Sequence, residues 1–533
     1  MAHLYGRQAF VELLISEGVT HLFGNPGTTE LPIMEALPDY PQLKFVLGLQ
    51  ESVVMGMADG FARASRKLTA ANVHVAPGLG NAMGALYNAK FSGSPVILTA
   101  GQQEQGHGLE VTRLQDLPLI MRRAAKIAMT PPTGPVFISL PGDILNDMAD
   151  IELGQSVRID NRVRPSDASL SELANALLSA KNPVIISGKE LNTPQAFADA
   201  AELATLMGAG VFQESVPYST SFSTSHTHYL GMLTRNQDNV RKTLDPFDLV
   251  LCLGADLLRM SVYSPTEPLP THSRVVHVSD RSWELGKNYR TELAVQANVA
   301  ETLPALLALL RSRTDAHYQA QAQARSQALA AQNWTTQRQK SVTQVLTQSA
   351  ARPMSAATFA MHISAQLTPD VIVVEEALTS TFPLPQFLHQ HHPDSFFGLA
   401  SGGLGFAIPG AVGVSMAKPS RPVVAIVGDG SAMYGIQGLW TAVHFKLPIT
   451  YVIANNRGYR IIKERLVSMQ GTDRFIGMDM DNPAIDYCQL AQSMGMRAVK
   501  VSNPADLDTA LKAGIQSGQP NLIEVMVSNG FGN

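Results

Sequence analysis

Two short polar segments in the C-terminal third of the chain carry residue types suited to binding a metal ion and phosphate. The first is Gly-Asp-Gly at 428–430, directly after the apolar run 423–427, and the second is Asn-Asn at 455–456, directly after the apolar run 450–454. Each pattern predicts a buried strand that ends in a polar turn. Ligands of α/β sheets lie beyond the carboxyl ends of such strands, so we expect both segments to face one site.

The side chains of Asp429 and Asn456 offer oxygen ligands of the kind that Mg²⁺ prefers to combine with phosphate oxygens. Gly428 and Gly430 allow the backbone to approach a diphosphate, and a helix that begins near Ser431 would direct its amides at the same anion. The pattern therefore predicts a site for Mg²⁺ and a diphosphate group, with one helix between its two segments. Each segment alone is a common turn, so two unrelated loops are the alternative.

Three further polar segments follow apolar runs in the N-terminal part of the chain. They are 24–32, which contains Thr28, then Glu51 at the start of a helical pattern, and 74–82, which begins with His74. We expect the three to converge on one edge of one sheet, because the carboxyl ends of parallel strands meet there. A Glu at a helix start is often a cap or a solvated residue, and a His beside an apolar strand is often a buried structural residue.

Apolar runs, turns and helical patterns alternate along the whole chain, which predicts an α/β fold with parallel, doubly wound sheets. We expect three such domains, at 1–153, 168–310 and 353–533, joined by a polar linker at 154–167 and a polar helical stretch at 311–348. Strands of the first two domains are expected at 21–23, 44–47, 73–75, 96–98, 136–140, 184–186, 249–253 and 275–278.

Composition narrows the class of protein. A formal net charge of −4 over 533 residues gives no sign of a nucleic-acid partner or of an acidic membrane surface. Only two cysteines, Cys252 and Cys488, are present, which excludes a disulfide scaffold and fits a reducing cytoplasm. The start of the chain lacks the apolar core of a signal peptide, and no segment is apolar enough to span a bilayer, so we expect a cytoplasmic protein without a membrane partner.

With these motifs the chain resembles the thiamine diphosphate-dependent 2-oxoacid decarboxylases of the acetolactate synthase-like superfamily, most of all the benzoylformate decarboxylase branch. The resemblance covers nearly the whole length. It implies a pyrimidine-binding domain at 1–153, a Rossmann-like middle domain at 168–310 and a diphosphate-binding domain at 353–533. It also implies thiamine diphosphate and Mg²⁺, or Ca²⁺ in its place, as cofactors, and a homodimer at minimum within an expected homotetramer.

The resemblance assigns roles to residues outside the metal site. Glu51 matches the glutamate that hydrogen-bonds the aminopyrimidine ring, and Leu404 matches the bulky residue that holds the cofactor bent. His74 matches a histidine that faces the substrate and helps proton transfer, and Thr28 matches a serine that binds the substrate carboxylate. The metal ligands implied are Asp429, Asn456 and the carbonyl of Gly458. The other cofactor contacts expected are Thr379, Ser380, Gly402, Gly428, Gly430, Ser431 and Tyr459.

The implied reaction is the non-oxidative decarboxylation of a small-molecule 2-oxoacid through a cofactor ylid and an enamine. The alternative is a carboligase of the acetolactate synthase type, which joins the enamine to a second carbonyl. His74 favours the decarboxylase, and we find no clear counterpart of the flavin-contacting Arg-Phe-Asp-Asp segment of acetolactate synthases. A nucleotide-binding module without enzymatic activity would leave Glu51 and the metal site without a purpose.

The sequence departs from the benzoylformate decarboxylase pattern at three places. Ser261 stands where that branch has a second active-site histidine, which favours the carboligase. Gly398 and the region of Arg465 stand where it has aromatic residues, so we expect a substrate that is smaller, more polar or anionic rather than benzoylformate-like. The alternative is that Arg465 faces solvent. Residues 106–112 are shorter than the matching loop and helix, which indicates either a truncated lid or an omitted loop.

Overall fold

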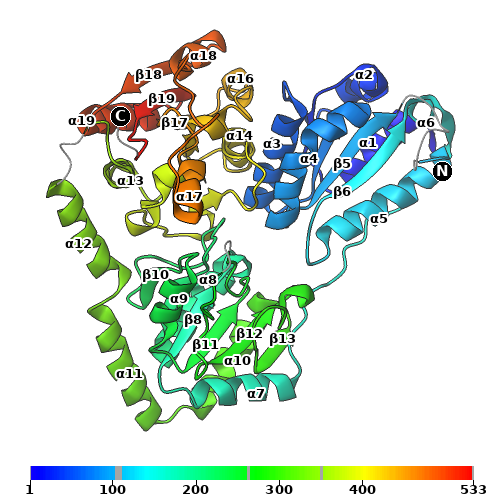
Figure 1. Cartoon of the computed structure of the whole chain (residues 1–533). Helices are drawn as coiled ribbons and strands as arrows, with labels where there is room; N and C mark the ends of the chain where they lie inside the picture. The colour runs from blue at the N-terminus through cyan, green and yellow to red at the C-terminus, as the bar shows by residue number, and fades with distance from the viewer. Residues whose placement is uncertain (1, 103–110, 261–263, 348–351, 531–533) are drawn as a thin grey trace.

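A computed structural model describes residues 2–102, 111–260, 264–347 and 352–530 (Figure 1). Three parallel sheets, each with helices on both faces, form three α/β units, which confirms the predicted fold class. Seven of the eight strands predicted in the first two units lie inside observed strands, as do the apolar runs at 423–427 and 450–454. No helix in the described ranges is both long and apolar enough to cross a membrane.

The first sheet has the strand order β3-β2-β4-β5-β6. An antiparallel pair, β1 (Ala2–Tyr5) with β7 (Met148–Ile151), brings the two ends of this unit together. The parallel strands are β2 (His21–Gly24), β3 (Lys44–Leu47), β4 (Thr69–Val73), β5 (Val96–Gln102) and β6 (Val136–Pro141). The helices are α1 (Gly6–Ser16), α2 (Leu31–Ala36), α3 (Glu51–Ser65), α4 (Val75–Ser92), α5 (Leu117–Met129) and α6 (Gly142–Asn146).

The strand predicted at 73–75 is wrong in its position. The observed strand β4 covers 69–73 and is buried along its whole length, although it is built from Thr, Ala and Asn as well as Val. The strand ends because the residue after it, His74, is the N-cap of α4, and the chain turns at Val75 with a φ of 43°. The small residues of β4 are therefore core residues, and His74 leaves the sheet at its carboxyl edge.

The middle unit has the strand order β10-β9-β8-β11-β12-β13. Its strands are β8 (Pro183–Ser187), β9 (Gly210–Gln213), β10 (Tyr229–Met232), β11 (Leu249–Leu253), β12 (Arg274–Ser279) and β13 (Leu293–Gln296). Its helices are α7 (Asp167–Leu178), α8 (Pro194–Met207), α9 (Gln237–Leu244) and α10 (Val299–Arg313). Two further helices, α11 (Ala316–Ala330) and α12 (Trp334–Thr347), form the long connection on one side of the molecule (Figure 1).

The third unit has the strand order β15-β14-β16-β17-β19-β18. Its strands are β14 (Ile372–Glu376), β15 (Phe396–Gly398), β16 (Val423–Gly428), β17 (Ile449–Asn455), β18 (Arg497–Val501) and β19 (Asn521–Met526). Its helices are α13 (Ala356–Gln366), α14 (Ala407–Ala417), α15 (Asp429–Ala432), α16 (Gly438–His444), α17 (Arg460–Gln470), α18 (Tyr487–Ser493) and α19 (Pro504–Gln516).

Helices α3 and α14 hold the first and third units together. Glycines allow their backbones to touch, since a Cβ on Gly60 would overlap the backbone of Gly410, and a Cβ on Gly413 would overlap the carbonyl of Met57. One apolar cluster therefore runs from the first sheet through both helices into the third sheet. Helix α3 begins at Glu51 and α14 follows the 402–406 loop, so this contact fixes two of the predicted site segments relative to each other.

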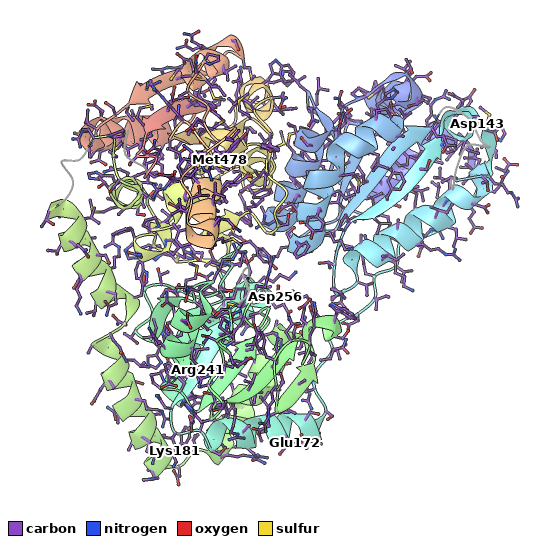
Figure 2. The ribbon with its side chains drawn as sticks, viewed as in Figure 1. Asp143, Glu172, Lys181, Arg241, Asp256 and Met478 are labelled. Carbon is purple, nitrogen blue, oxygen red and sulfur yellow. The ribbon has the colours of Figure 1, made fainter. Side chains whose placement is uncertain are left out.

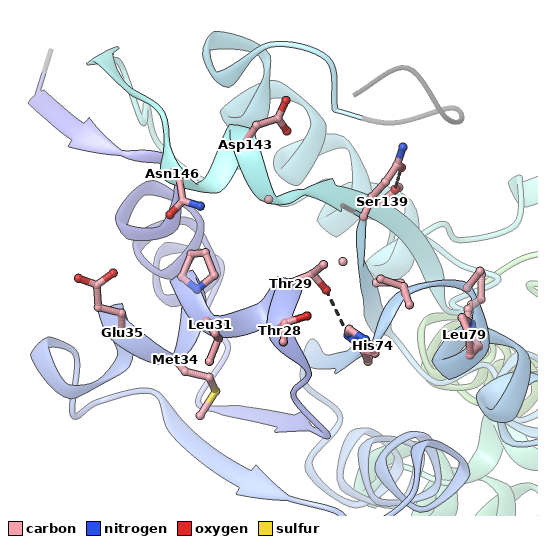
Figure 3. A pocket seen from close by; sticks show the side chains of 18 of the residues that line it. Thr28, Thr29, Leu31, Met34, Glu35, His74, Leu79, Ser139, Asp143 and Asn146 are labelled. Atoms are coloured by element: carbon pink, nitrogen blue, oxygen red, sulfur yellow. Dashed lines mark hydrogen bonds between the residues drawn. The ribbon is translucent and has the colours of Figure 1, made fainter. Parts of the chain in front are cut away.

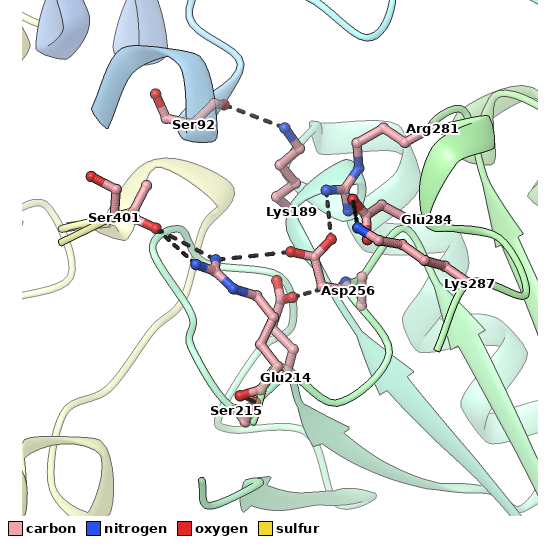
Figure 4. Close-up of polar contacts among 12 residues, drawn as sticks. Ser92, Lys189, Glu214, Ser215, Asp256, Arg281, Glu284, Lys287 and Ser401 are labelled. Carbon is pink, nitrogen blue, oxygen red and sulfur yellow. Dashed lines mark hydrogen bonds and ion pairs between the residues drawn. The ribbon is translucent and has the colours of Figure 1, made fainter. Parts of the chain in front are cut away.

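Charged side chains fix the middle unit against the other two (Figure 4). Lys189 donates to the carbonyl of Ser92 at 3.4 Å, and Arg259 donates to the carbonyl of Ala400 at the same distance. Asp256, which lies where the three units meet (Figure 2), forms an ion pair of 2.6 Å with Arg281. Charged residues at the carboxyl edge of the middle sheet thus contact one another and both other units.

Candidate active site

The carboxyl edge of the first sheet brings together the three residues that the sequence placed there. Thr28, Glu51 and His74 follow β2, β3 and β4, which are neighbours in the sheet. Thr28 and His74 line one cavity of about 1450 Å³ (Figure 3). The described residues that line this cavity all lie between 28 and 146, so none of them comes from the described part of the third unit.

Glu51 is not the cap of helix α3, which removes one alternative for this residue. The cap is Gln50, whose side chain accepts from the backbone N–H of Ser52 at 2.6 Å. The Glu51 carboxylate instead accepts a hydrogen bond of 3.0 Å from Asn81 on α4, and Gly78 leaves space beside it. A half-buried carboxylate is thus held by α4 at the carboxyl edge of the sheet, where it can exchange a proton with a ligand.

His74 is not a fully buried structural residue either. Its side chain is 36% exposed, and its Nδ1 lies 2.7 Å from an oxygen of Glu30, which is buried. Sequence reasoning missed Glu30, although it belongs to the same segment as Thr28. Its position two residues after Thr28, at a strand end that meets the His74 loop, was the available signal.

The third sheet brings together the predicted metal ligands. Strands β16 and β17 are neighbours, and Asp429 and Asn456 follow them directly. One Asp429 oxygen accepts from the backbone N–H of Asn456 at 3.1 Å and of Gly458 at 3.3 Å, and the other accepts from the N–H of Gly430 at 2.8 Å. The two predicted segments therefore form one site and are not unrelated loops.

The surroundings of Asp429 suit a residue that binds a cation. The carboxyl group is buried, and burial raises its pKa to about 6. Among the described residues, no lysine or arginine forms an ion pair with it, and its hydrogen-bond donors are backbone amides. A divalent cation would supply the missing positive charge, and the Asn456 side chain and the Gly458 carbonyl offer the oxygen ligands that such a cation prefers.

The helix predicted after Asp429 begins two residues earlier than expected and is one turn long. Helix α15 covers 429–432, turns follow, and α16 begins at Gly438. In these turns Gly435 packs closely against the carbonyl of Gly405, where a Cβ would lie 3.0 Å away. The prediction of one helix between the two segments is therefore wrong, although α15 still begins at the site and contains the buried Ser431.

Two residues that sequence reasoning missed hold the 402–406 loop. The buried Glu376 accepts from the backbone N–H groups of Gly405 and Ala407, both at 2.7 Å, and burial raises its pKa to about 8. Asn88 of α4 accepts from the amides of Ala400 and Ser401 at 3.0 and 3.1 Å. These contacts leave Gly402 exposed and Leu404 half-buried. Glu376 ends β14, and that strand end was the signal for it.

The loop after β14 places Thr379 and Ser380 in the short helix η6 (Leu378–Thr381), where both are buried. Tyr459 precedes α17. A Cβ on Gly430 would lie only 2.7 Å from a carbon of the Tyr459 ring, which explains the second glycine in Gly-Asp-Gly.

Backbone strain marks three of these loops. In the described part of the chain six residues other than glycine have a positive φ, and three of them are Val75, Leu378 and Arg457. Each is next to a predicted site residue, at the ends of β4, β14 and β17. Such conformations cost on the order of 1–3 kcal/mol each and cluster at functional sites.

The residues that departed from the family pattern have different surroundings. Gly398 ends β15, where it lies against the ring of Phe396 and does not line the cavity beside His74. Arg465 is exposed on α17, which extends from the predicted metal ligands toward the middle unit (Figure 1). Ser261 and the short 106–110 segment lie outside the described residues.

Three family models match the chain. Residues 4–115 match the N-terminal TPP binding domain of thiamine pyrophosphate enzymes, residues 170–306 match their central domain, and residues 379–525 match their C-terminal TPP binding domain. The predicted site residues of the first and third units fall within the two TPP binding domains.

Known proteins resemble the chain over its full length. Benzoylformate decarboxylase of Pseudomonas aeruginosa is 32% identical over 97% of this chain and 98% of its own. The large subunit of acetolactate synthase isozyme 1 from Escherichia coli is 27% identical over 98% of this chain and 94% of its own. A structure of the thiamine diphosphate-dependent 4-hydroxybenzoylformate decarboxylase of Rhodococcus jostii RHA1 matches with a TM-score of 0.86 and 30% identity, covering 98% of this chain and 99% of that one.

Proposed function

Because the chain belongs to the thiamine pyrophosphate enzymes, we propose that it binds thiamine diphosphate with Mg²⁺ and decarboxylates a 2-oxoacid. The observation that carries this proposal is the placement of His74 beside Thr28 on one cavity, with Glu51 on the neighbouring strand end. This set combines a group that exchanges protons, a hydroxyl for a carboxylate and a carboxyl group for the cofactor ring. The test is decarboxylation that requires both thiamine diphosphate and Mg²⁺.

The third unit would hold the charged end of the cofactor. Asp429, Asn456 and the carbonyl of Gly458 would bind Mg²⁺, or Ca²⁺ in its place, because Asp429 contacts the backbone of both other residues and has no cationic partner among the described residues. Thr379 and Ser380 would add hydroxyl donors to the diphosphate from the adjacent strand end.

The chemistry divides between cofactor and protein. Bound thiamine diphosphate supplies the carbanion chemistry that a 2-oxoacid needs to lose CO₂. Glu51 would share a proton with the aminopyrimidine ring, and Leu404 would hold the cofactor bent. In the cavity, Thr28 would donate to the substrate carboxylate and His74 would exchange a proton with the substrate.

A carboligase is the second candidate function. The similarity to acetolactate synthase and the Ser at position 261, where a second histidine is expected in a decarboxylase, favour it. The two functions differ in product, since a decarboxylase releases an aldehyde and a carboligase releases a hydroxyketone. A reaction with a 2-oxoacid and a second aldehyde, with products separated by mass, distinguishes them.

We expect a small or polar 2-oxoacid to be a better substrate than benzoylformate. Arg465 is exposed on α17, which begins beside the proposed metal ligands, and a guanidinium that reaches the substrate would favour an anionic or strongly polar group. Arg465→Phe should shift kcat/KM toward benzoylformate by about 10-fold relative to pyruvate, the magnitude of one added apolar contact. Arg474→Phe, an exposed arginine of the same unit, is the control and should not change the ratio.

Two results together would contradict a preference for small or polar 2-oxoacids. If the native enzyme already processes benzoylformate far better than pyruvate, glyoxylate and 2-oxoglutarate, and Arg465→Phe leaves the ratio unchanged, then Arg465 faces solvent in the active enzyme. The substrate would then be an aryl 2-oxoacid, as the names of the similar decarboxylases indicate for those proteins.

We propose a homodimer as the smallest active species, within a homotetramer. The described residues that line the cavity beside His74 all belong to the first unit. The diphosphate site of a second copy can therefore complete the active site. Helix α4, beside this cavity, also exposes an apolar stripe at positions four residues apart, formed by Met83, Tyr87 and Phe91, which are 51%, 52% and 37% exposed. A second copy of the chain would bury this stripe.

The stripe gives a test of assembly. Tyr87→Arg should convert the protein to a monomer and remove most activity, because a buried unpaired guanidinium is costly at an interface. Light scattering at assay concentration measures the mass. Ile127→Arg, on α5 and 60% exposed, is the control and should stay assembled and active. A fully active monomer would contradict the shared site.

A further inference from the structure

Glu30 is a buried carboxylate whose four contacts connect the carboxyl ends of three strands. It is 1% exposed. One oxygen accepts from the N–H of Gly101 at 3.1 Å and from the hydroxyl of Thr29 at 2.7 Å. The other accepts from the N–H of Gly27 at 2.9 Å and lies 2.7 Å from Nδ1 of His74. Two backbone amides and one hydroxyl thus donate to its oxygens, and the contact with His74 is the fourth.

The structure leaves space for this pair through two glycines. A Cβ on Gly27 would overlap the His74 ring, and a Cβ on Gly101 would overlap the carboxylate of Glu30. Gly27 follows strand β2, and Gly101 lies at the end of strand β5. The sheet itself therefore fixes the position of Glu30. The pair is therefore part of the packing of the strand ends and not a chance surface contact.

These contacts fix which nitrogen of His74 carries the proton. The Thr29 hydroxyl donates its hydrogen to Glu30, so its oxygen, 3.2 Å from Nδ1, can only accept from the ring. Among the described residues Nδ1 therefore faces two acceptors and no donor, which favours a proton on it. The other ring nitrogen, Nε2, is left for the cavity that His74 lines together with Thr28 (Figure 3).

We propose that Glu30 is a positioning residue that holds His74 with a proton on Nδ1 and with Nε2 directed at the substrate. The proposal rests on the proposed function for the role of His74 in proton transfer. The orientation of the ring rests only on the geometry of Glu30, Thr29 and His74. A histidine that exchanges protons needs its second nitrogen fixed by such a partner, because an unrestrained ring can carry the proton on either nitrogen.

The test is Glu30→Gln in the full-length holoenzyme. The glutamine amide nitrogen donates, so the variant can place a donor against Nδ1 and move the ring proton to Nε2. We expect kcat to fall by about 100-fold, the scale of a lost general acid or base, with KM changed less than about threefold. Glu152→Gln is the control, because Glu152 belongs to the same unit, is exposed and does not line the cavity. It should change neither constant.

A spectroscopic readout separates positioning from a general structural role. Nitrogen-15 NMR of the imidazole, with the His74 signal identified by its loss in His74→Ala, should show Nδ1–H in the wild type and Nε2–H in Glu30→Gln. In the His74→Ala background, Glu30→Gln should cause no further loss of kcat, because the two residues act as one unit.

Two results would overturn the proposal. One is a wild-type His74 that carries its proton on Nε2, which needs no variant to measure and so holds even if Glu30→Gln fails to fold. The other is a 100-fold loss from Glu30→Gln in the His74→Ala background, which would show that Glu30 acts through the fold. Full decarboxylase activity in His74→Ala would instead contradict the proposed role of His74 in proton transfer, while the NMR result would still decide whether Glu30 orients the ring.

Discussion

Glu51→Gln is expected to keep the fold and to bind thiamine diphosphate, yet to lose most of its activity. The Glu51 carboxylate, on α3, is half-buried and accepts a hydrogen bond from Asn81 of α4. It has no capping role, so the glutamine amide can occupy the same space. The amide cannot share the proton that the aminopyrimidine ring needs. We expect the exchange rate of the C2 proton of the bound cofactor, measured by quenched-flow NMR, to fall by 100-fold or more, on the scale of a lost general acid or base.

Glu301→Gln is the matched control for this substitution. Glu301 also stands in the first turn of a helix, α10, whose cap is a separate residue, Asn298. This variant should exchange the C2 proton at the wild-type rate. Wild-type exchange in Glu51→Gln would remove Glu51 from the mechanism and would leave Asn81 and Glu51 as a contact between helices only.

Asp429→Ala is expected to abolish binding of Mg²⁺ and thiamine diphosphate. The substitution removes one oxygen ligand and leaves the diphosphate charge uncompensated, in a site where no lysine or arginine of the described residues pairs with Asp429. We expect calorimetric affinity for the cofactor with Mg²⁺ to fall by more than about 100-fold, since each ~1.4 kcal/mol of lost coordination is tenfold in Kd.

Removing a buried carboxylate could also relax the loops that it holds, so the fold is measured alongside affinity. Asp473→Ala, an exposed acid of the same unit, is the control and should bind the cofactor normally. Unchanged cofactor affinity in Asp429→Ala, with an intact fold by circular dichroism, would refute the assignment of the metal site.

The strand ends were predictable because their signals are local. The Gly-Asp-Gly and Asn-Asn segments each follow an apolar run within a few residues, and a parallel sheet then brings Asp429 and Asn456 together. Thr28 and His74 were placed by the same argument. The strand boundary at His74 was missed because β4 is rich in Ala and Asn, which are buried there by the neighbouring strands and helices.

The contacts that orient the site were not predictable from the sequence. Glu30 meets His74 across 44 residues, and Glu376 meets the amides of Gly405 and Ala407 across about 30. Each carboxylate stands at or near a strand end, which is a local signal, but no local pattern identifies its distant partners, because those contacts exist only after the sheet has formed. The length of α15 was missed for the same reason, since the turns that follow it bring Gly435 close to Gly405, which is distant in sequence.

The most direct test of the central claim is product analysis with the purified full-length protein. Pyruvate, glyoxylate, 2-oxoglutarate and benzoylformate are each incubated with the protein, with and without thiamine diphosphate and Mg²⁺, and CO₂ and organic products are resolved by mass. We expect at least one of these acids to give CO₂ and the aldehyde that is one carbon shorter, and to do so only when thiamine diphosphate and Mg²⁺ are both present. Release of no CO₂ from any of the acids, or equal release without the cofactors, would contradict it.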